Sequence, residues 1–372
     1  MKISFIITST GWGGLEMNTL KLAKSLQSRG FIITLITCDD SSIYTRSRSE
    51  FDSIVLIKKS TFKYFNFISS YTIYKALKEF GIDRVMIFDN KDLDVMAWTK
   101  KLFFKSLILL YQQHMQIGIR KRDFIHTLRF KSINYWICPL NYLRVEVLER
   151  TRFAVDKIKV IPIGVELQKF VSTKISREEA RKNLNISSSC LLLGIIGRVS
   201  EKKGQLFVIE SLMKLRERGY NVELLIYGSP TVNDPDCQRY YDKICTKIRE
   251  CNLEEIVHFI EHKEDTLPFY CATDVFVLAS HGETYGMVTI EAMLTKTPVI
   301  ATRSEATIEM LDYGSNGLLF DYKNHEMFYD QFSLLINNKS ETERMINRAY
   351  NGAIEKYDHE KEVQEVINLL NR

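Results

Sequence analysis

The sequence lacks a long hydrophobic run. Its longest apolar stretch, Leu102 to Tyr111, is interrupted by Lys105 and is far shorter than the ~20 residues that a membrane span requires. The apolar run in the opening MKISFIITSTGWGG is too short for a signal-peptide core and leads directly into glycines. We therefore expect a cytoplasmic chain that neither crosses a membrane nor is exported.

The chain also lacks a cysteine framework. It has seven cysteines, an odd number, and no two of them form a CxxC pair. This pattern argues against disulfides or a zinc site and favours isolated thiols in a reducing compartment. No RNP, zinc-finger or helix-turn-helix pattern occurs, so nucleic acid is not an expected partner.

Charge is distributed unevenly along the 372 residues, a length that suits two domains. Residues 1–160 contain 26 Lys and Arg against 14 Asp and Glu, a net of +12, whereas the remainder contains 25 against 32, a net of −7. In the basic half, cations alternate with aromatic residues between Lys100 and Trp136. Two interpretations remain open, a surface that rests peripherally on an anionic membrane or a solvated face over core aromatics.

Hydrophobic periodicity predicts two halves of alternating strands and helices, each with a parallel sheet. In the first half we expect a glycine turn at 11–14, a helix at 15–28, and strands at 2–8, 31–37, 53–57, 84–88, 106–111 and 136–140, the last being the final strand of that half. This opening is Rossmann-like, but a dinucleotide fingerprint from Gly11 would need glycine at position 16, which is Glu16. In the second half we expect strands at 191–196, 222–227, 256–260 and 275–278, and an amphipathic helix at 357–371.

The stretch 279–300 combines a strand end, a glycine loop and a helix predicted to open near Tyr285. Backbone N–H groups and the positive end of a helix dipole would then converge on one point, which is an anion site. Glu283 and Glu291 flank it, and if most of their spacing is helical they lie roughly 10 to 12 Å apart along the axis. That separation suits a sugar at one end of a diphosphate and a ribose at the other. The alternative is a core helix with two solvated carboxylates.

A second motif, Gly197-Arg198-Val-Ser-Glu-Lys-Lys203-Gly204, follows the strand at 191–196. The arginine fork suits two phosphate oxygens, and the lysine adds a compact charge. The glycines at each end allow the loop to fold closely against a ligand. Surface cations in an ordinary loop are the alternative.

Together the two motifs resemble the E-x7-E and G-R-x4-K-G signatures of the family-4 retaining glycosyltransferases ("glycosyl transferases group 1"), bacterial envelope type. The resemblance implies the α/β GT-B fold, with two Rossmann-like domains facing across a cleft. Residues 1–168 would bind the acceptor and residues 169–352 the nucleotide-sugar. Residues 353–372 would form a helix that returns to the first domain.

The resemblance also implies roles for individual residues. Glu283 would contact hydroxyls of the donor sugar and Glu291 would bind the ribose. The amides of Tyr285, Gly286 and Met287 would meet the diphosphate.

Five further positions complete the implied site. Arg198 and Lys203 would stabilise charge on the leaving phosphate, so neither a metal nor a cofactor is expected. His114, at a strand end, would contact the donor sugar near the reacting centre. Gly13 and Gly14 resemble the family's GG-x-E turn and would allow close approach of donor phosphate and acceptor.

Acidic residues near the strand at 84–88 are candidates for other roles. Asp89 and Asn90 could orient the acceptor hydroxyl. Asp92-Leu-Asp94 resembles the DxD metal motif of the other glycosyltransferase fold, but it is predicted on a helix in the acceptor half, so metal binding is not expected.

The implied activity is transfer of a hexosyl or N-acetylhexosaminyl group, without a metal, to a saccharide or lipid-linked saccharide in envelope polysaccharide or lipopolysaccharide synthesis. UDP-sugar is the favoured donor and a GDP-mannose type is second. A nucleotide-sugar 2-epimerase and a non-catalytic sugar-nucleotide-binding protein are the alternatives.

Overall fold

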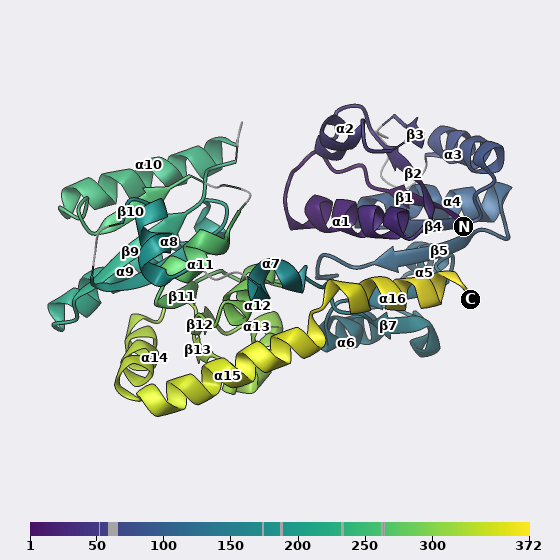
Figure 1. The fold of residues 1–372 in the computed structure, drawn as a ribbon. Helices are drawn as coiled ribbons and strands as arrows, with labels where there is room; N and C mark the ends of the chain where they lie inside the picture. Colours follow the sequence, from purple (N-terminus) through teal and green to yellow (C-terminus); the bar gives the residue numbers. More distant parts are fainter. Residues whose placement is uncertain are drawn as a thin grey trace. The chain divides into compact units, whose positions relative to one another are not determined.

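The computed structural model of the protein describes residues 1–51, 53–58, 66–172, 175–186, 189–231, 234–261, 263 and 265–372. The chain forms two compact units (Figure 1). Unit 1 comprises Met1–Gly164 with His359–Arg372, and unit 2 comprises Val165–Asp358. The chain thus changes unit after Gly164 and Asp358, compared with 168 and 352 in the division made from the sequence.

Unit 1 is built on a parallel sheet of order β3-β2-β1-β4-β5-β6-β7. Its strands are β1 (Lys2–Ile6), β2 (Ile32–Thr37), β3 (Ser53–Leu56), β4 (Arg84–Ile87), β5 (Ile108–Gln112), β6 (Tyr135–Cys138) and β7 (Ile158–Val160). The prediction that the strand beginning at Trp136 is the last of this half is wrong, because Trp136 pairs with Ile158 of β7. A three-residue edge strand is too short for hydrophobic periodicity to detect.

The helices of unit 1 include one from the far end of the sequence. They are α1 (Gly14–Ser28), α2 (Ser42–Ser47), α3 (Phe67–Phe80), η1 (Asn90–Asp92), α4 (Leu93–Trp98), the π-helical turn η2 (Thr99–Phe103), α5 (Phe124–Phe130), α6 (Asn141–Arg150), η3 (Val155–Lys157) and α16 (His359–Leu370). In α16, Val363 and Val366 are fully buried in the cluster that contains Ile3 and Phe5. Burial of this apolar stripe holds the C-terminal helix to unit 1.

Unit 2 has a parallel sheet of order β10-β9-β8-β11-β12-β13. Its strands are β8 (Leu191–Ile196), β9 (Val222–Tyr227), β10 (Val257–Ile260), β11 (Val275–Leu278), β12 (Val299–Thr302) and β13 (Leu318–Phe320). Its helices are α7 (Leu167–Val171), α8 (Arg177–Asn183), η4 (Glu201–Lys203), α9 (Gln205–Glu217), α10 (Pro235–Glu250), α11 (Leu267–Ala272), α12 (Met287–Leu294), α13 (Glu305–Met310), η5 (Asp312–Gly314), α14 (His325–Asn337) and α15 (Lys339–Lys356).

Both sheets reverse their strand order beside their first strand. In unit 1, β1 lies between β2 and β4, and in unit 2, β8 lies between β9 and β11. Connections leave in opposite directions at such a switch point, and open α/β sheets bind ligands there, outside the carboxyl ends of the strands. A ligand is therefore expected at the loops that follow β1, β4, β8 and β11.

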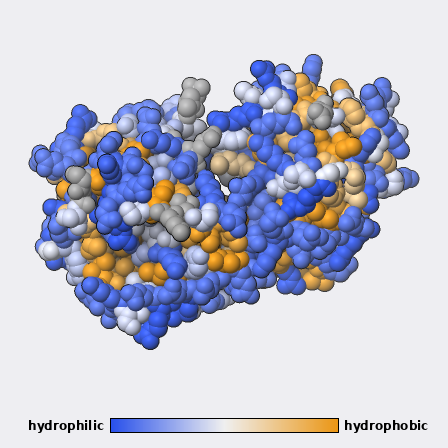
Figure 2. Space-filling view, viewed as in Figure 1, coloured by the Kyte–Doolittle hydropathy of each residue, from blue (hydrophilic) through white to orange (hydrophobic). Residues whose placement is uncertain are grey.

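Among the described residues, no helix combines the length and the hydrophobicity needed to cross a bilayer. Hydrophobic residues are nevertheless visible on the surface of both units in Figure 2, scattered among hydrophilic ones.

Candidate functional site

The loops after β8 and β11 lie against each other at the switch point of unit 2. The Lys203 Nζ is 2.9 Å from the Glu283 Oε2, and the His281 N–H donates to the Lys202 carbonyl at 2.7 Å. Lys203 and Glu283, one from each predicted motif, are 80 residues apart in the sequence. The fold therefore brings them together at one site.

Glycine at position 204 is required by contact between these two loops. Gly204 has a φ of +75°, and a Cβ built on it would lie 2.3 Å from the Ala279 carbonyl oxygen. A side chain at this position would force the β8 loop away from the β11 loop. The second glycine of the motif thus serves backbone packing within the protein.

The helix after β11 begins later than predicted. Gly286, with a φ of +87°, is the N-cap of α12, so the helix begins at Met287 and not near Tyr285. A left-handed residue stops helical geometry from extending backwards, and glycine adopts that conformation without strain. Tyr285 is instead buried, with its ring centroid 6.4 Å from that of Tyr357.

The two glutamates differ in their setting. Glu283 stands in the loop four residues before Met287, and Glu291 stands four residues after it on α12, so only half of their spacing is helical and the predicted axial separation does not apply. Glu291 is half-buried and accepts a hydrogen bond from the Thr266 hydroxyl at 3.2 Å. Burial raises the pKa of Tyr270 well above its usual value, and the negative charge of Glu291 adds to this effect.

Arg198 is exposed, in contrast to the paired Lys203. Its carbonyl accepts from the Gln205 Nε2 at 3.0 Å, which fixes the backbone of the loop and leaves the guanidinium toward solvent. No carboxylate of the described chain forms an ion pair with that guanidinium. An exposed arginine in the same loop as Lys203 can reorient to bind an anion.

At the switch point of unit 1, the loop that contains Gly13 and Gly14 follows β1. The Gly13 N–H donates to the Glu16 carboxylate at 2.9 Å, and α1 starts at Gly14, around which a Cβ would meet no atom within 4 Å. Both glycines therefore lie at the carboxyl edge of the sheet, where a ligand can approach the backbone closely. Sequence reasoning noted the motif but assigned no role to Glu16.

Asp92 anchors the start of the same loop from the β4 side. Its carboxylate accepts from the Thr8 N–H at 3.0 Å and from the Thr8 hydroxyl at 2.5 Å. Burial raises the pKa of Asp92 to about 7, and the nearby Asp89 charge adds to the effect of burial while the Thr8 bonds oppose it. Sequence reasoning considered Asp92 only as a metal ligand and missed this role.

The remaining acidic residues of this edge also have partners within the protein. Asp94 forms an ion pair with Arg129, whose guanidinium nitrogen Nε is 3.0 Å from the Asp94 carboxylate. Arg129 also donates to the Asn90 side-chain oxygen at 2.8 Å, and Asp89 accepts from the Lys91 N–H at 2.9 Å. Among the described residues, no group of three or more His, Cys, Asp or Glu side chains is placed to hold a metal ion.

His114 follows β5 at the same edge. Its ring centroid is 6.1 Å from that of Phe88, and its Nε2 is buried with no hydrogen-bond partner in the described chain. Burial lowers the pKa of His114 to about 4, an effect that the Glu362 charge opposes and the Lys21 charge reinforces. The imidazole is therefore neutral at pH 7, and its buried Nε2 has unused hydrogen-bonding capacity.

A buried polar network behind His114 was not found from the sequence. Glu362 of α16 accepts from the Gln112 side chain at 3.2 Å, the Gly164 N–H at 3.0 Å and the His359 Nδ1 at 2.9 Å. The Gln112–Glu362 bond joins residues 250 positions apart, so no local pattern could reveal it. The network fixes the C-terminal helix and the end of β5 in one geometry.

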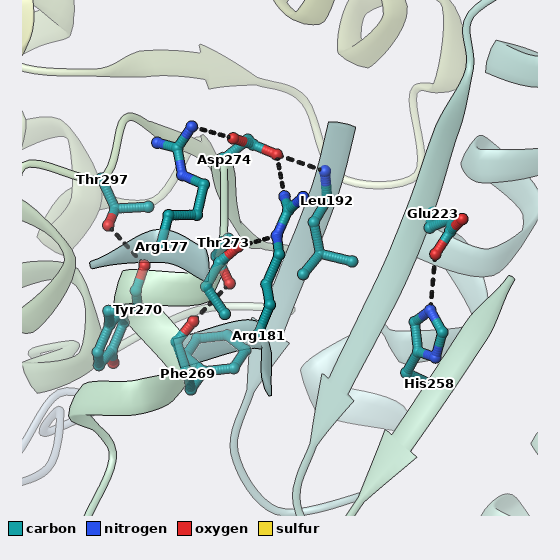
Figure 3. A network of polar contacts seen from close by, with 11 residues as sticks. Arg177, Arg181, Leu192, Glu223, His258, Phe269, Tyr270, Thr273, Asp274 and Thr297 are labelled. Atoms are coloured by element: carbon teal, nitrogen blue, oxygen red, sulfur yellow. Dashed lines mark hydrogen bonds and ion pairs between the residues drawn. The ribbon is translucent and has the colours of Figure 1, made fainter. Parts of the chain in front are cut away.

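A cavity of about 910 Å³ lies away from these loops, at the amino ends of β8 and β11. Figure 3 shows Asp274 between Arg177 and Arg181, to which it pairs at 2.7 and 2.6 Å, and it also accepts from the Leu192 N–H at 2.7 Å. Arg181 further donates to the Ala272 carbonyl at 3.1 Å. These contacts brace α8 against the sheet and lie at the edge opposite the motif loops.

Comparison with known proteins agrees with this geometry. The family model for glycosyl transferases group 1 matches residues 176–352, and the model for glycosyltransferase family 4 matches residues 12–169. The chain is 27% identical over 218 residues to a D-inositol 3-phosphate glycosyltransferase of Corynebacterium urealyticum, covering 57% of this chain and 50% of that protein. It is 29% identical over 178 residues to the capsular polysaccharide biosynthesis glycosyltransferase CapM of Staphylococcus aureus, covering 48% and 44%. These alignments span about half the length of the relatives.

Solved structures match over the whole chain. Anabaena HepE in complex with UDP superposes with a TM-score of 0.84 at 20% identity, covering 100% of both chains. Sucrose-phosphate synthase from Thermosynechococcus elongatus superposes with a TM-score of 0.78 at 17% identity, covering 100% of this chain and 98% of that one. With matching family models on both units and this fold, the chain belongs to the group 1 glycosyltransferases of family 4 and has the GT-B fold.

Proposed function

We propose that the protein transfers a sugar, with retention of anomeric configuration, from a nucleoside diphosphate sugar to a hydroxyl of a saccharide or lipid-linked saccharide. The observation that carries the proposal is the 2.9 Å contact between Lys203 and Glu283, beside the start of α12. A cation, a carboxylate and a helix N-terminus thus lie at one switch point. These three groups suit a phosphate and an adjoining sugar.

In the proposed reaction the bond between the anomeric carbon and the phosphate oxygen breaks, and a bond from that carbon to the acceptor oxygen forms. The acceptor proton passes to the departing phosphate. Arg198, Lys203 and the amides that begin at Gly286 stabilise the charge that builds on the β-phosphate, electrostatic work that can be worth several kcal/mol. Glu283 orients the sugar through its hydroxyls, and Glu291 binds the ribose.

Uridine diphosphate is the proposed nucleotide, and guanosine diphosphate is the second choice. HepE, which shares the fold, has been crystallised with UDP and with UDP-glucose. Two side-chain cations supply the positive charge that a metal provides in other transferases, so the proposed reaction needs none. We place His114 beside the donor sugar, because a neutral, unpartnered Nε2 can exchange a hydrogen bond with a hydroxyl.

The proposed setting is the cytoplasmic face of a membrane, where envelope polysaccharide or lipopolysaccharide is assembled. Two features support it, the similarity to CapM and the net charge of +12 in residues 1–160, from 26 cations and 14 anions. The transferred group would be a hexosyl or N-acetylhexosaminyl residue.

Thermal shift with UDP, GDP, UDP-sugars and GDP-sugars, on the wild type and on Lys203→Ala, tests the donor site. We expect UDP-sugars to raise the melting temperature of the wild type and to have little effect on the variant. Donor hydrolysis and transfer with and without EDTA then test catalysis, and we expect EDTA to have no effect. Conversion of the donor to its 2-epimer without acceptor would indicate an epimerase, and binding without turnover would indicate a binding protein.

A further inference from the structure

Exposed apolar side chains gather on one face of unit 1, formed by α3, η2 and α5. We call this the apolar face and define it by Phe67, Ile68, Tyr71, Leu102, Phe124 and Ile125. Phe124 is 78% exposed, Ile68 is 84% exposed and Leu102 is 51% exposed. Soluble proteins rarely leave large apolar side chains this exposed in one region unless the region binds something.

The apolar face is continuous across the three elements. Phe67 on α3 packs its ring edge-on against Trp98 at 5.4 Å, and Tyr71 packs against Phe103 of η2 at 5.4 Å. Trp98 in turn lines a cavity of about 140 Å³ together with Phe124 and Ile125 of α5. Trp98 thus packs against α3 and shares a cavity with α5, so it lies between the two helices.

Positive charge surrounds the apolar face. Residues 95–131 contain eight Lys and Arg and one Asp, a net of +7. The Lys75 Nζ lies 4.8 Å from the centre of the Tyr71 ring and the Lys78 Nζ lies 4.2 Å from that of Phe104. Burial lowers the pKa of Lys101 below its usual value, and the charge of Lys131 adds to this effect.

Not every cation of the stretch can reach a ligand. Arg129 is paired with Asp94, and Arg122 donates to the carbonyls of Leu148 and Thr151 at 2.9 and 3.0 Å. Charge reversal at Arg122 would therefore disturb the fold as well as the surface. Lys105 and Lys131 are exposed and are the cleaner probes.

We propose that the apolar face docks on the surface of an anionic lipid bilayer. Phe124 and Ile125 insert at the boundary between headgroups and acyl chains, and the surrounding lysines contact anionic headgroups. Aromatic and aliphatic side chains ringed by lysine are the composition that interfacial binding favours. A second copy of the chain is a poor occupant, because two such positive surfaces repel each other.

Vesicle flotation of the full chain tests this proposal without donor or acceptor, so its failure is distinct from a failure of sugar transfer. We expect binding to vesicles of phosphatidylglycerol and phosphatidylcholine, and little to phosphatidylcholine alone. Phe124→Ser with Ile125→Ser should lower the affinity about 100-fold, since both side chains leave the acyl region. Lys105→Gln with Lys131→Gln should lower it about 30-fold, since each cation adds roughly fivefold near an anionic surface.

The matched control is Leu334→Ser on α14, a residue of unit 2 that is 49% exposed, like Ile125 at 47%. It should bind vesicles within twofold of the wild type, and circular dichroism should show that all variants are folded. Wild-type affinity in both face variants, or equal binding to neutral vesicles, would overturn the proposal. A dimer in sedimentation that the Phe124/Ile125 variant dissociates would assign the face to a second copy.

Discussion

The switch points of the two units occupy the same topological position but carry different chemistry. In unit 2 the loops beside β8 and β11 present Arg198, Lys203 and the start of α12. In unit 1 the loops after β1 and β4 hold Asp92 against Thr8, and the buried His114, which follows β5, is neutral at pH 7. One fold thus offers an edge whose loop carries Arg198 and Lys203, and an edge where a buried carboxyl and a neutral imidazole follow the strands.

This difference fits a division of labour between the units. A diphosphate needs donors and positive charge, which unit 2 supplies. The hydroxyls of a donor sugar are uncharged and are served by neutral hydrogen-bonding groups, and His114, proposed to contact that sugar, has a neutral imidazole with an unpartnered Nε2.

The largest effect should come from removing the cations of unit 2. We expect Lys203→Ala and Arg198→Ala each to lower kcat for transfer about 100- to 1000-fold, because charge on the leaving phosphate loses a preorganised partner. Steady-state transfer assays measure this. Lys202→Ala is the matched control, since Lys202 is exposed in the same loop and contributes its carbonyl to His281. An equal loss of kcat in Lys202→Ala and in both other variants would contradict a specific role of Lys203 and Arg198 in unit 2.

A second test separates loop packing from chemistry. Gly204→Ala places a Cβ 2.3 Å from the Ala279 oxygen at a φ of +75°, and we expect unit 2 to lose about 3 kcal/mol of stability. Gly219→Ala is the control, because its φ of +88° imposes similar backbone strain but a Cβ there would meet no atom within 4 Å. It should cost about 1 kcal/mol. Calorimetry of the unit 2 transition compares the two, and equal losses would show that the two loops do not depend on close contact.

The third test sharpens the roles of the two glutamates. Glu291→Gln should weaken UDP binding about 30-fold, since a hydrogen bond to a charged group is worth roughly 2 kcal/mol. Glu283→Gln should leave UDP binding unchanged or tighter, because UDP lacks the transferred sugar that Glu283 is proposed to contact and Lys203 loses its 2.9 Å partner. Isothermal titration with UDP measures both. A large loss of UDP affinity in Glu283→Gln would contradict the proposed orientation of the donor.

The sequence was sufficient to predict what depends on local patterns. Alternating apolar strands and helices predicted two parallel sheets, and the structure confirms both. The motifs at Gly197–Gly204 and Glu283–Glu291 predicted a common site in unit 2, and the Lys203–Glu283 contact brings them together. Each motif carries its chemistry within about ten residues, so a local signal sufficed.

Other features depend on contacts that local patterns do not encode. The strand β7 is only three residues long, and the helix after β11 starts at Met287 because Gly286 adopts a left-handed conformation. The Glu362 network joins residues up to 250 positions apart. From the sequence, Asp92 was considered only as part of a DxD metal motif. Its burial against Thr8 was missed because it follows from the packing of β4 beside β1, not from spacing in the sequence.

The last test concerns the pH dependence of unit 1. Burial raises the pKa of Asp92 from 3.8 to about 7, so its contribution to stability is fully present below pH 3.8 and is lost as the pH rises to 7. Burial lowers the pKa of His114 from 6.5 to about 4, so its contribution is present above pH 6.5 and is lost as the pH falls to 4. The two groups therefore oppose each other over the window that they share.

Asp92→Asn should separate these contributions, because asparagine stays neutral and still accepts one bond from Thr8. Relative to the wild type, the variant should gain stability as the pH rises from 4 to 7, by on the order of 1 kcal/mol per pH unit at the steepest, and remain level above pH 7. Urea unfolding followed by tryptophan fluorescence reports unit 1 alone, since Trp12, Trp98 and Trp136 all belong to it. A difference between variant and wild type that does not change with pH would mean that Asp92 ionises normally, and the contrast between buried, neutral groups in unit 1 and the cations of unit 2 would then rest on His114 alone.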